Sequence, residues 1–330
     1  MKKLICIGLF FAALFTGCAE PSVYIAGWED YGTSRIATIW KNGVARRFID
    51  GRHNNAVALS VFVTPKNDVY VAGYDVKPMR SVARLWKNGA GKYLTDGSGF
   101  SEANSVFVEN DNVYVVGRES NRAILWKNGA AQSLTDGKFN ACALSVYVSD
   151  NDVYIAGREQ NELGNNVAKL WKNGVEQSLT DGTFNASALS VHVSGNNTYV
   201  VGYEENTEGK SIAKVWKNET VQNLTDGSYF NAKANHVFVL NDDVYIAGYE
   251  FVTSWRSVAK VWKNGTVQNL TDGTARAAAY SVYVRDNDVY VVGDERNDDG
   301  IYVVKLWKNG IARSLSSGER DAMAFSVFVK

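Results

Sequence analysis

The segment Val167-Ala-Lys-Leu-Trp-Lys-Asn-Gly174 contains the phrase that decides the fold of this chain. Its Trp-Lys-Asn core occurs seven times, at intervals of 40 to 46 residues, with the tryptophans at Trp40, Trp86, Trp126, Trp171, Trp216, Trp262 and Trp307. A period of this length is typical of propeller blades. The repeat therefore predicts the architecture before any single residue is considered.

One repeat, residues 145–182, predicts four short strands. Two apolar runs, 145–148 and 153–157, are separated by a polar turn and form a hairpin. A variable loop then leads to a third strand at 167–171, and Asn173-Gly174 supplies a two-residue turn, because both residues tolerate positive φ. The fourth strand is expected at 177–180. Four antiparallel strands per repeat make one propeller blade.

The two ends of the repeat array predict how the ring closes. The chain begins its repeats at 23–27 with a second strand that lacks a first, and it ends at 326–329 with a first strand that lacks a second. We therefore expect an all-β fold, a seven-bladed β-propeller of four-stranded antiparallel blades. The ring would be closed by the C-terminal strand completing the N-terminal blade, which leaves no free edge.

The first residues predict export from the cytoplasm. Lys2 and Lys3 precede an apolar run at 4–15, which is typical of a signal peptide and too short for an ordinary membrane-spanning helix. Residues 14–18, Leu-Phe-Thr-Gly-Cys, look like a bacterial lipobox, and this resemblance implies that 1–17 is a lipoprotein signal peptide. We assign 18–22 to a short tether and 23–330 to the β-propeller. In the alternative, the protein is soluble and secreted, and Cys18 is incidental.

Composition narrows the class of partner. Lysine plus arginine and aspartate plus glutamate both number 35, so the chain has no overall positive charge with which to bind nucleic acid. No spacing of histidines, cysteines or acids matches a metal site or a nucleophile with its base, so we expect neither a cofactor nor a metal. With Cys6 in the signal and Cys18 lipidated, Cys142 remains alone, as a small packed residue rather than a nucleophile.

Two charged rings follow from the repeat. An acid stands two places after each second-strand glycine, at Glu29, Asp75, Glu119, Glu159, Glu204, Glu250 and Glu295. Carboxylates can bind calcium or act as acids and bases, but third-strand cations such as Arg84 and Lys260 favour structural ion pairs. The lysine of each Trp-Lys-Asn lies on the opposite face. That lysine ring is either an ordinary set of solvated turns or a surface for anionic head groups.

Candidate binding residues lie where the copies differ. Trp28 and Trp255 are outside the repeat, and Tyr74, Tyr203 and Tyr249 occupy the place of Trp28 in other blades. Phe251 and Trp255 lie in the longest apolar loop, Tyr249 to Arg256. Aromatic side chains on one face suit sugar rings or a protein partner. Four phenylalanines of the blade-to-blade loops are expected instead to fill blade junctions: Phe100, Phe139, Phe184 and Phe230.

The three histidines offer little catalytic machinery. His192 replaces an aromatic residue such as Phe62, and His236 replaces a serine such as Ser60. Only His53, in a loop, has no role explained by the repeat. We therefore expect a protein that is not an enzyme.

The chain resembles bacterial seven-bladed propeller lipoproteins over residues 23–330. Leu14-Phe15-Thr16-Gly17-Cys18 looks like a lipobox, and this resemblance implies lipidation of Cys18. Ala19 follows in place of an acid, which favours the outer membrane. The Ala-x-Leu-Trp-x-Asn-Gly segments are also similar to extracellular HAF-type repeats, without their His-Ala-Phe signature.

These observations predict a non-enzymatic binding module displayed from the cell envelope. The ligand would be a protein or a carbohydrate bound by the variable loops, the membrane would be reached through the lipid anchor only, and the ring would be a monomer. An envelope-assembly scaffold is the alternative, followed by a propeller-based glycan hydrolase or lyase.

Overall fold

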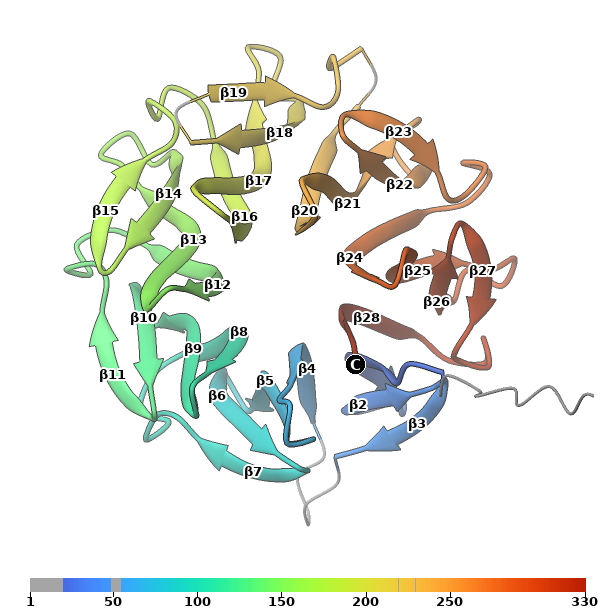
Figure 1. Cartoon of the computed structure of the whole chain (residues 1–330), viewed down its shortest axis with the longest axis horizontal. Helices are drawn as coiled ribbons and strands as arrows, with labels where there is room; N and C mark the ends of the chain where they lie inside the picture. Colours follow the sequence, from blue (N-terminus) through green and yellow to red (C-terminus); the bar gives the residue numbers. More distant parts are fainter. Residues whose placement is uncertain (1–19, 49–54, 219, 229) are drawn as a thin grey trace, which may run out of the picture.

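The chain folds into a ring of seven four-stranded antiparallel sheets around a central channel (Figure 1). This computed structural model describes residues 20–48, 55–218, 220–228 and 230–330. The predicted seven-bladed propeller is therefore confirmed. Within those ranges no helix is long and apolar enough to cross a membrane.

Each blade contributes one strand to each of four concentric layers. The innermost strands are β4 (Ala56–Val63), β8 (Ser101–Glu109), β12 (Ala141–Ser149), β16 (Ala186–Ser194), β20 (Ala232–Leu240), β24 (Ala277–Arg285) and β28 (Ala322–Val329). The second strands are β1 (Val23–Asp30), β5 (Val69–Lys77), β9 (Asn112–Glu119), β13 (Asp152–Gln160), β17 (Asn197–Glu205), β21 (Asp243–Phe251) and β25 (Asp288–Arg296).

The two outer layers are shorter. The third strands are β2 (Arg35–Lys41), β6 (Arg80–Lys87), β10 (Arg122–Lys127), β14 (Asn166–Lys172), β18 (Ser211–Lys217), β22 (Ser257–Lys263) and β26 (Tyr302–Lys308). The outermost are β3 (Val44–Arg47), β7 (Ala90–Tyr93), β11 (Ala130–Ser133), β15 (Val175–Ser178), β19 (Thr220–Asn223), β23 (Thr266–Asn269) and β27 (Ile311–Ser314). Blade 1 is β28-β1-β2-β3, and blades 2 to 7 follow in chain order from β4–β7 to β24–β27.

The Asn-Gly turns set the start of each outermost strand. Asn173 and Gly174 have φ of 53° and 82°, and Lys172 pairs directly with Val175 across them. The prediction of a fourth strand at 177–180 is therefore wrong by two residues. Because a two-residue turn leaves no spacer, β15 begins at once, and the Leu179-Thr180 segment already leads to the next blade.

A bulge in each innermost strand explains the second-strand glycine. The register of β12 against β13 shifts between Ala143 and Ser145, opposite Gly157. A Cβ on Gly157 would lie 2.1 Å from the carbonyl oxygen of Cys142, so no larger residue fits. The same clash, at 1.8 to 2.1 Å, applies at Gly27, Gly73, Gly117, Gly202, Gly248 and Gly293.

The seven repeat tryptophans fill the junctions between blades, as predicted. Each is at most 5% exposed. Trp126 of blade 3, for example, packs in one cluster with Tyr70 and Ala72 of blade 2. Truncating a buried tryptophan to alanine costs about 3–5 kcal/mol in a well-packed core, so this layer supplies much of the cohesion between sheets.

The ring closes as predicted, because β28 pairs with β1 in a single sheet. The main chains of Ser22 and Lys330 exchange hydrogen bonds of 2.7 and 2.9 Å beyond the ends of these strands. The Lys330 ammonium also bonds to the carbonyls of Thr64 and Pro65 in blade 2. The two ends of the propeller are therefore joined to each other and to the following blade.

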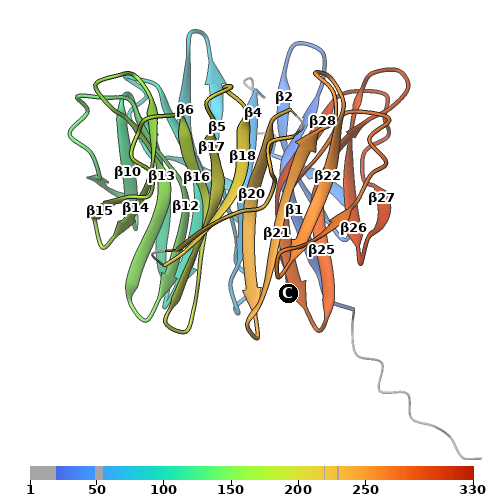
Figure 2. The same cartoon turned by 90° about the horizontal axis from the view of Figure 1, so that it is seen from above.

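Strand direction divides the connections between two faces. The constant face carries the first-to-second-strand turns and the Lys-Asn-Gly turns. The variable face carries the second-to-third-strand loops and the links between blades. Ser22 and Lys330 lie on the constant face, which is the lower edge in Figure 2, where the C-terminus is marked.

Candidate functional site

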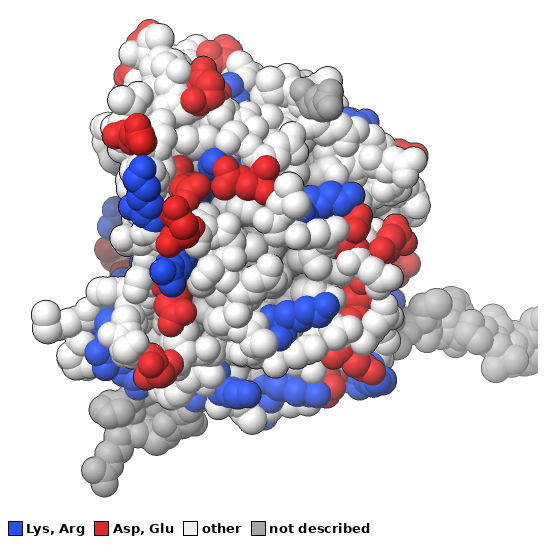
Figure 3. Space-filling model, turned by 90° about the vertical axis from the view of Figure 1, so that its left-hand side faces the viewer, with Lys and Arg blue, Asp and Glu red and all other residues white. Residues whose placement is uncertain are grey.

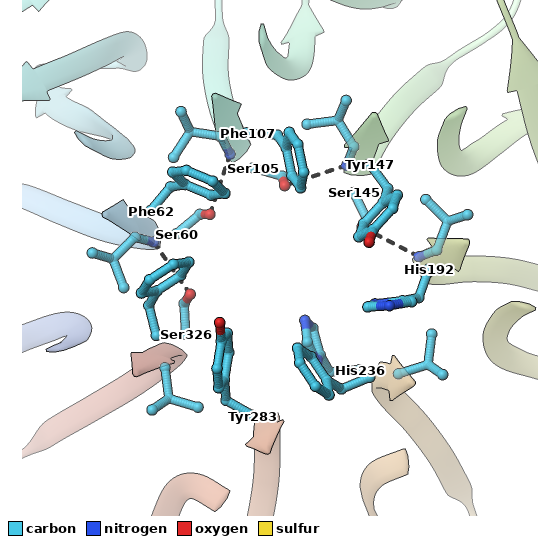
Figure 4. A pocket seen from close by; sticks show the side chains of 18 residues that line it. Ser60, Phe62, Ser105, Phe107, Ser145, Tyr147, His192, His236, Tyr283 and Ser326 are labelled. Atoms are coloured by element: carbon cyan, nitrogen blue, oxygen red, sulfur yellow. Dashed lines mark hydrogen bonds between the residues drawn. The ribbon is translucent and has the colours of Figure 1, made fainter. Parts of the chain in front are cut away.

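A closed ring of hydrogen bonds lines the central channel, and Figure 4 shows part of it. In each blade a side chain of the innermost strand accepts from the backbone N–H of the next blade, at 3.2 to 3.4 Å. The acceptors are Ser60, Ser105, Ser145, Ser190, His236, Ser281 and Ser326. His236 uses Nδ1 for the role that serine Oγ has elsewhere, so its prediction as a serine replacement is confirmed.

A second ring, of aromatic side chains, lies two residues further along the same strands. Neighbouring ring centroids are 4.4 to 5.1 Å apart all the way round, at Phe62, Phe107, Tyr147, His192, Phe238, Tyr283 and Phe328. His192 is therefore a core aromatic, as predicted. Burial lowers the pKa of His192 to about 3 and that of His236 to about 4, so both are neutral near pH 7.

The cavity inside these two rings is too small for a sugar or peptide. Its volume is about 110 Å³, whereas ligand pockets usually measure about 300–1,000 Å³. The space suits a few water molecules, each of which takes roughly 30 Å³ in the liquid. The channel centre is therefore too small for such a ligand, and its two rings of side chains are structural.

The ring of acids is largely occupied by ion pairs. Lys214 and Lys260 lie 2.5 Å from Glu204 and Glu250, and Lys305 lies 3.2 Å from Glu295. Arg84 pairs with Asp75 at 3.0 Å and Lys169 with Glu159 at 3.8 Å. Glu29, with Thr38 in the cation position, is bound instead by Arg47 at 2.7 Å. These pairs confirm the structural interpretation for six of the seven acids.

The lysines of the constant face are also satisfied within their own blades. Each stacks over a second-strand tyrosine at 5.1 to 5.3 Å, as Lys172 does over Tyr154. Four of them also form an ion pair, at 2.7 to 2.9 Å, with the aspartate that starts or directly precedes the second strand of the same blade: Lys87, Lys172, Lys263 and Lys308. This geometry favours solvated turns over a head-group surface.

The copies differ at one pair of positions on the variable side of the channel. We define the inner rim as the residue after each second-strand glycine together with its register partner on the innermost strand. The seven pairs are Trp28–Met323, Tyr74–Val57, Arg118–Glu102, Arg158–Cys142, Tyr203–Ser187, Tyr249–Lys233 and Asp294–Ala278. No two pairs are alike, although the strands around them repeat.

The structure separates the predicted aromatic candidates into three groups. Trp28 is buried, 6% exposed, beneath the Arg35 guanidinium at 4.6 Å, so it offers no open face to a ligand. Tyr74 and Tyr203 are half-buried on the rim. Tyr249 and Phe251 meet edge to face at 5.6 Å in blade 6, and Trp255, in the loop after β21, is 59% exposed.

The phenylalanines of the blade links differ from their prediction. Phe100 and Phe230 are 50% and 46% exposed, so they do not fill blade junctions. The Trp-Lys-Asn tryptophans already occupy that space. The two phenylalanines therefore add apolar surface to the variable face, and Phe139 and Phe184 are half-buried.

The sequence interpretation missed the charged members of the inner rim. The charged members are Arg118, Arg158 and Asp294, at the repeat position of the predicted aromatics, and Glu102 and Lys233, at that of their register partners. Aligning the seven repeats at the second-strand glycine would have found three of them. To place Lys233 on the rim, the register between β20 and β21 is needed as well, because a bulge separates Lys233 from His236, which stands at the repeat's serine position.

Other kinds of site find little support in the part of the chain that the structure describes. There, no three His, Cys, Asp or Glu side chains converge to hold a metal ion. Cys142 is buried, and burial raises the pKa of its thiol, which opposes the thiolate form. Cys18 and His53 lie outside the described residues.

Comparison with known proteins supports the fold and assigns no activity. No family model matches the chain, and no curated protein matches its sequence. Among solved structures, it is similar to the β-propeller domain of the trilobed protease from Pyrococcus furiosus, with a TM-score of 0.57 and 11% identity over 91% of this chain and 93% of that one. That domain is described as having an open velcro topology, whereas β28 closes the ring here.

Proposed function

We propose that this protein is a non-enzymatic binding module that a bacterium displays from its cell envelope. A lipid on Cys18 anchors it, in the outer membrane since Ala19 is not an acid, and the variable face binds a protein or glycan. The lipobox-like 14–18 segment and the resemblance to propeller lipoproteins support the anchor. A propeller fold by itself assigns no ligand.

One observation carries the assignment of the binding face. The constant face repeats its lysine–tyrosine contacts in all seven blades, whereas the inner rim of the variable face has seven different pairs. A specific ligand needs an asymmetric set of groups, and a ring of identical turns provides none. The exposed Trp255 lies on the same variable face.

Surface charge agrees with a ligand other than nucleic acid. Figure 3 shows one side of the ring, on which lysines and arginines are interspersed with aspartates and glutamates. On this side the two signs of charge alternate, so it offers no continuous basic stripe to follow a phosphate backbone. Glu250, which in a hydrolase would serve as an acid or base, is buried and paired with Lys260.

The experiment is binding of residues 20–330 to an array of glycans and peptidoglycan fragments. This range contains all 28 strands and both partners of the closure, Ser22 and Lys330. We expect Trp255→Ala and Tyr249→Ala to weaken binding about tenfold or more, because aromatic anchors dominate such interfaces. Binding that both variants retain would refute the assigned face.

If the protein binds nothing on the array, the alternative is favoured, an envelope-assembly scaffold. Crosslinking in intact cells would then identify partner proteins. Turnover of a polysaccharide that Glu250→Gln abolishes would instead make the protein an enzyme and contradict the proposal.

A further inference from the structure

Two cations occupy the inner rim on either side of Tyr203, in a run of three neighbouring blades. Arg158 belongs to β13 of blade 4, and Lys233 belongs to β20 of blade 6. Tyr203 of blade 5 lies between them in ring order, with its ring centroid 4.2 Å from the Lys233 Nζ. Lys233 is half-buried, and burial followed by the charge of Arg158 lowers its pKa.

Neither cation has a counter-ion among the residues that the structure describes. Within that part of the chain, Arg158 and Lys233 make no ion pair and no side-chain hydrogen bond. The contrast is Arg118, at the same rim position in blade 3, whose Nε lies 3.0 Å from the Glu102 carboxylate. Glu205, whose negative charge partly offsets this lowering of the Lys233 pKa, accepts a hydrogen bond from Asn185 at 3.1 Å.

Two half-buried cations without counter-ions are unfavourable for the stability of the ligand-free protein. Two like charges repel each other, and partial burial removes water that would screen them. An incoming anion would relieve both penalties. Arginine and lysine together suit a carboxylate or sulfate, since the guanidinium offers a planar pair of donors and the ammonium a compact charge.

A neighbouring hydroxyl is also unsatisfied. Ser187, the register partner of Tyr203, is fully buried, and its Oγ has no hydrogen-bond partner in the described part of the chain. Buried polar groups in folded proteins are normally bonded. Tyr203 therefore lies beside a buried polar group whose hydrogen-bonding capacity is unused in the described part of the chain.

Aromatic side chains of blade 6 follow Lys233. Tyr249 is the register partner of Lys233, and Phe251 and the exposed Trp255 follow it along blade 6. Arg276 lies over Phe251 at 5.4 Å. Cations beside aromatic planes match a ligand that combines negative charge with the flat apolar faces of sugar rings.

We propose that Arg158 and Lys233 bind the acidic group of an anionic saccharide, whose neighbouring rings pack against Tyr249, Phe251 and Trp255. This inference rests on the proposed function and names the class of ligand. Carboxylate and sulfate share the required chemistry, so the experiment has an arm for each.

The test is calorimetric titration of the purified full-length protein with oligogalacturonate and with its fully methyl-esterified form. Dextran sulfate against dextran is the sulfate arm. We expect an acidic saccharide to bind, its neutral counterpart to bind at least tenfold more weakly, and affinity to fall as salt rises. Lys233→Gln and Arg158→Gln should each weaken binding about tenfold or more.

Lys210→Gln is the matched control. Lys210 carries the same charge in the variable loop of blade 5, but it is paired with Glu208 at 2.9 Å. We expect it to leave affinity within about twofold, since solvated pairs contribute little. Lys233→Gln should keep or raise the melting temperature, because it removes a half-buried charge without a partner, so lost binding would not reflect unfolding.

The outcomes separate this inference from the proposed function. Equal binding of acidic and neutral saccharides would overturn the inference and keep a glycan-binding module. Binding of polyglutamate but of no saccharide would overturn it and keep a protein-binding one. Equal losses for Lys210→Gln and Lys233→Gln would reduce the effect to net charge and overturn it too. The inference would also be overturned if Trp255→Ala abolished binding and Lys233→Gln left it unchanged.

Discussion

At the scale of single residues, Asp294 shows how a repeat position can acquire a different chemistry. It occupies the inner-rim place of Tyr74 and is 1% exposed, with its Oδ2 lacking a hydrogen-bond partner among the described groups. Burial raises the pKa of this carboxyl to about 7, against the opposing effect of a hydrogen bond with Tyr280. The folded protein therefore holds a proton that an unfolded chain would release.

This raised pKa predicts a pH-dependent effect of Asp294→Asn. The unfolded carboxyl ionises near pH 4, whereas the folded one keeps its proton to about pH 7, so its contribution to stability is lost as pH rises through that window. The amide cannot ionise. We expect the variant to match the wild type near pH 4 and to melt several degrees higher above pH 7, measured by circular dichroism.

Asp288 provides the control at the other end of β25. Its half-buried carboxylate is bound by Lys308, which holds its pKa below the usual value. Asp288→Asn should therefore bring no gain at high pH. If Asp294→Asn is less stable than the wild type at pH 8, the carboxylate is charged and satisfied in the fold, and our interpretation of it is wrong.

At the scale of elements, β28 has the largest predicted effect on the ring. It supplies the innermost strand of blade 1, buries Val327 and Val329, and carries Ser326, which accepts from Val61 of blade 2 at 3.2 Å. Deleting residues 324–330 exposes the edge of β1 and opens the hydrogen-bond ring. We expect a fall in melting temperature on the order of 10 °C or more, measured by calorimetry.

Lys330→Gln distinguishes the strand from its terminal side chain. This change removes only the ammonium contacts to Thr64, Pro65 and Asn67, which lie at 2.6 to 2.9 Å. A shift of no more than a few degrees is expected. A deletion variant that melts like the intact protein would show that closure by β28 is dispensable.

The elements that repeat were predictable from the sequence, because seven copies of a pattern remove the ambiguity of each one. Strand order, closure, the buried tryptophans and the acid–cation pairs such as Glu250–Lys260 all follow from shared positions. The fourth strand was misplaced because Leu179, an apolar residue after the true strand, looked like part of it. Its side chain packs beside a blade junction from the link to the next blade.

The candidate site was less predictable, because it depends on what differs between blades. Trp28 looked like Tyr249 in the sequence, yet Arg35 and the neighbouring strands bury it. Lys233 is identified as a rim residue only by its register with Tyr249 across a bulged strand. Pairwise contacts between blades, such as that of Lys233 with Tyr203, depend on the radius of the ring and cannot be derived from one repeat.

At the scale of the whole molecule, the positions of the chain ends relate the two faces to a membrane. Ser22 bonds to Lys330 on the constant face, and only residues 19–22 separate the ring from Cys18. Four residues reach roughly 14 Å at most. Innermost strands of eight or nine residues span about 28 Å at roughly 3.3 Å per residue, so the variable face lies beyond this reach.

A lipidated Cys18 would therefore hold the constant face beside the bilayer and direct the inner rim away from it. Single cysteines at two exposed sites of blade 4 test this orientation: Val175→Cys beside the Asn-Gly turn, and Leu163→Cys in the variable loop, 73% and 80% exposed in the wild type. With a fluorophore on each and a nitroxide-labelled lipid as quencher, we expect strong quenching at 175 and little at 163.

Cys142 is buried and should not compete for the label. Cys18→Ser should abolish quenching at both sites. Stronger quenching at 163 than at 175 would reverse the orientation and place the inner rim against the membrane, where a soluble saccharide could not reach Arg158 and Lys233.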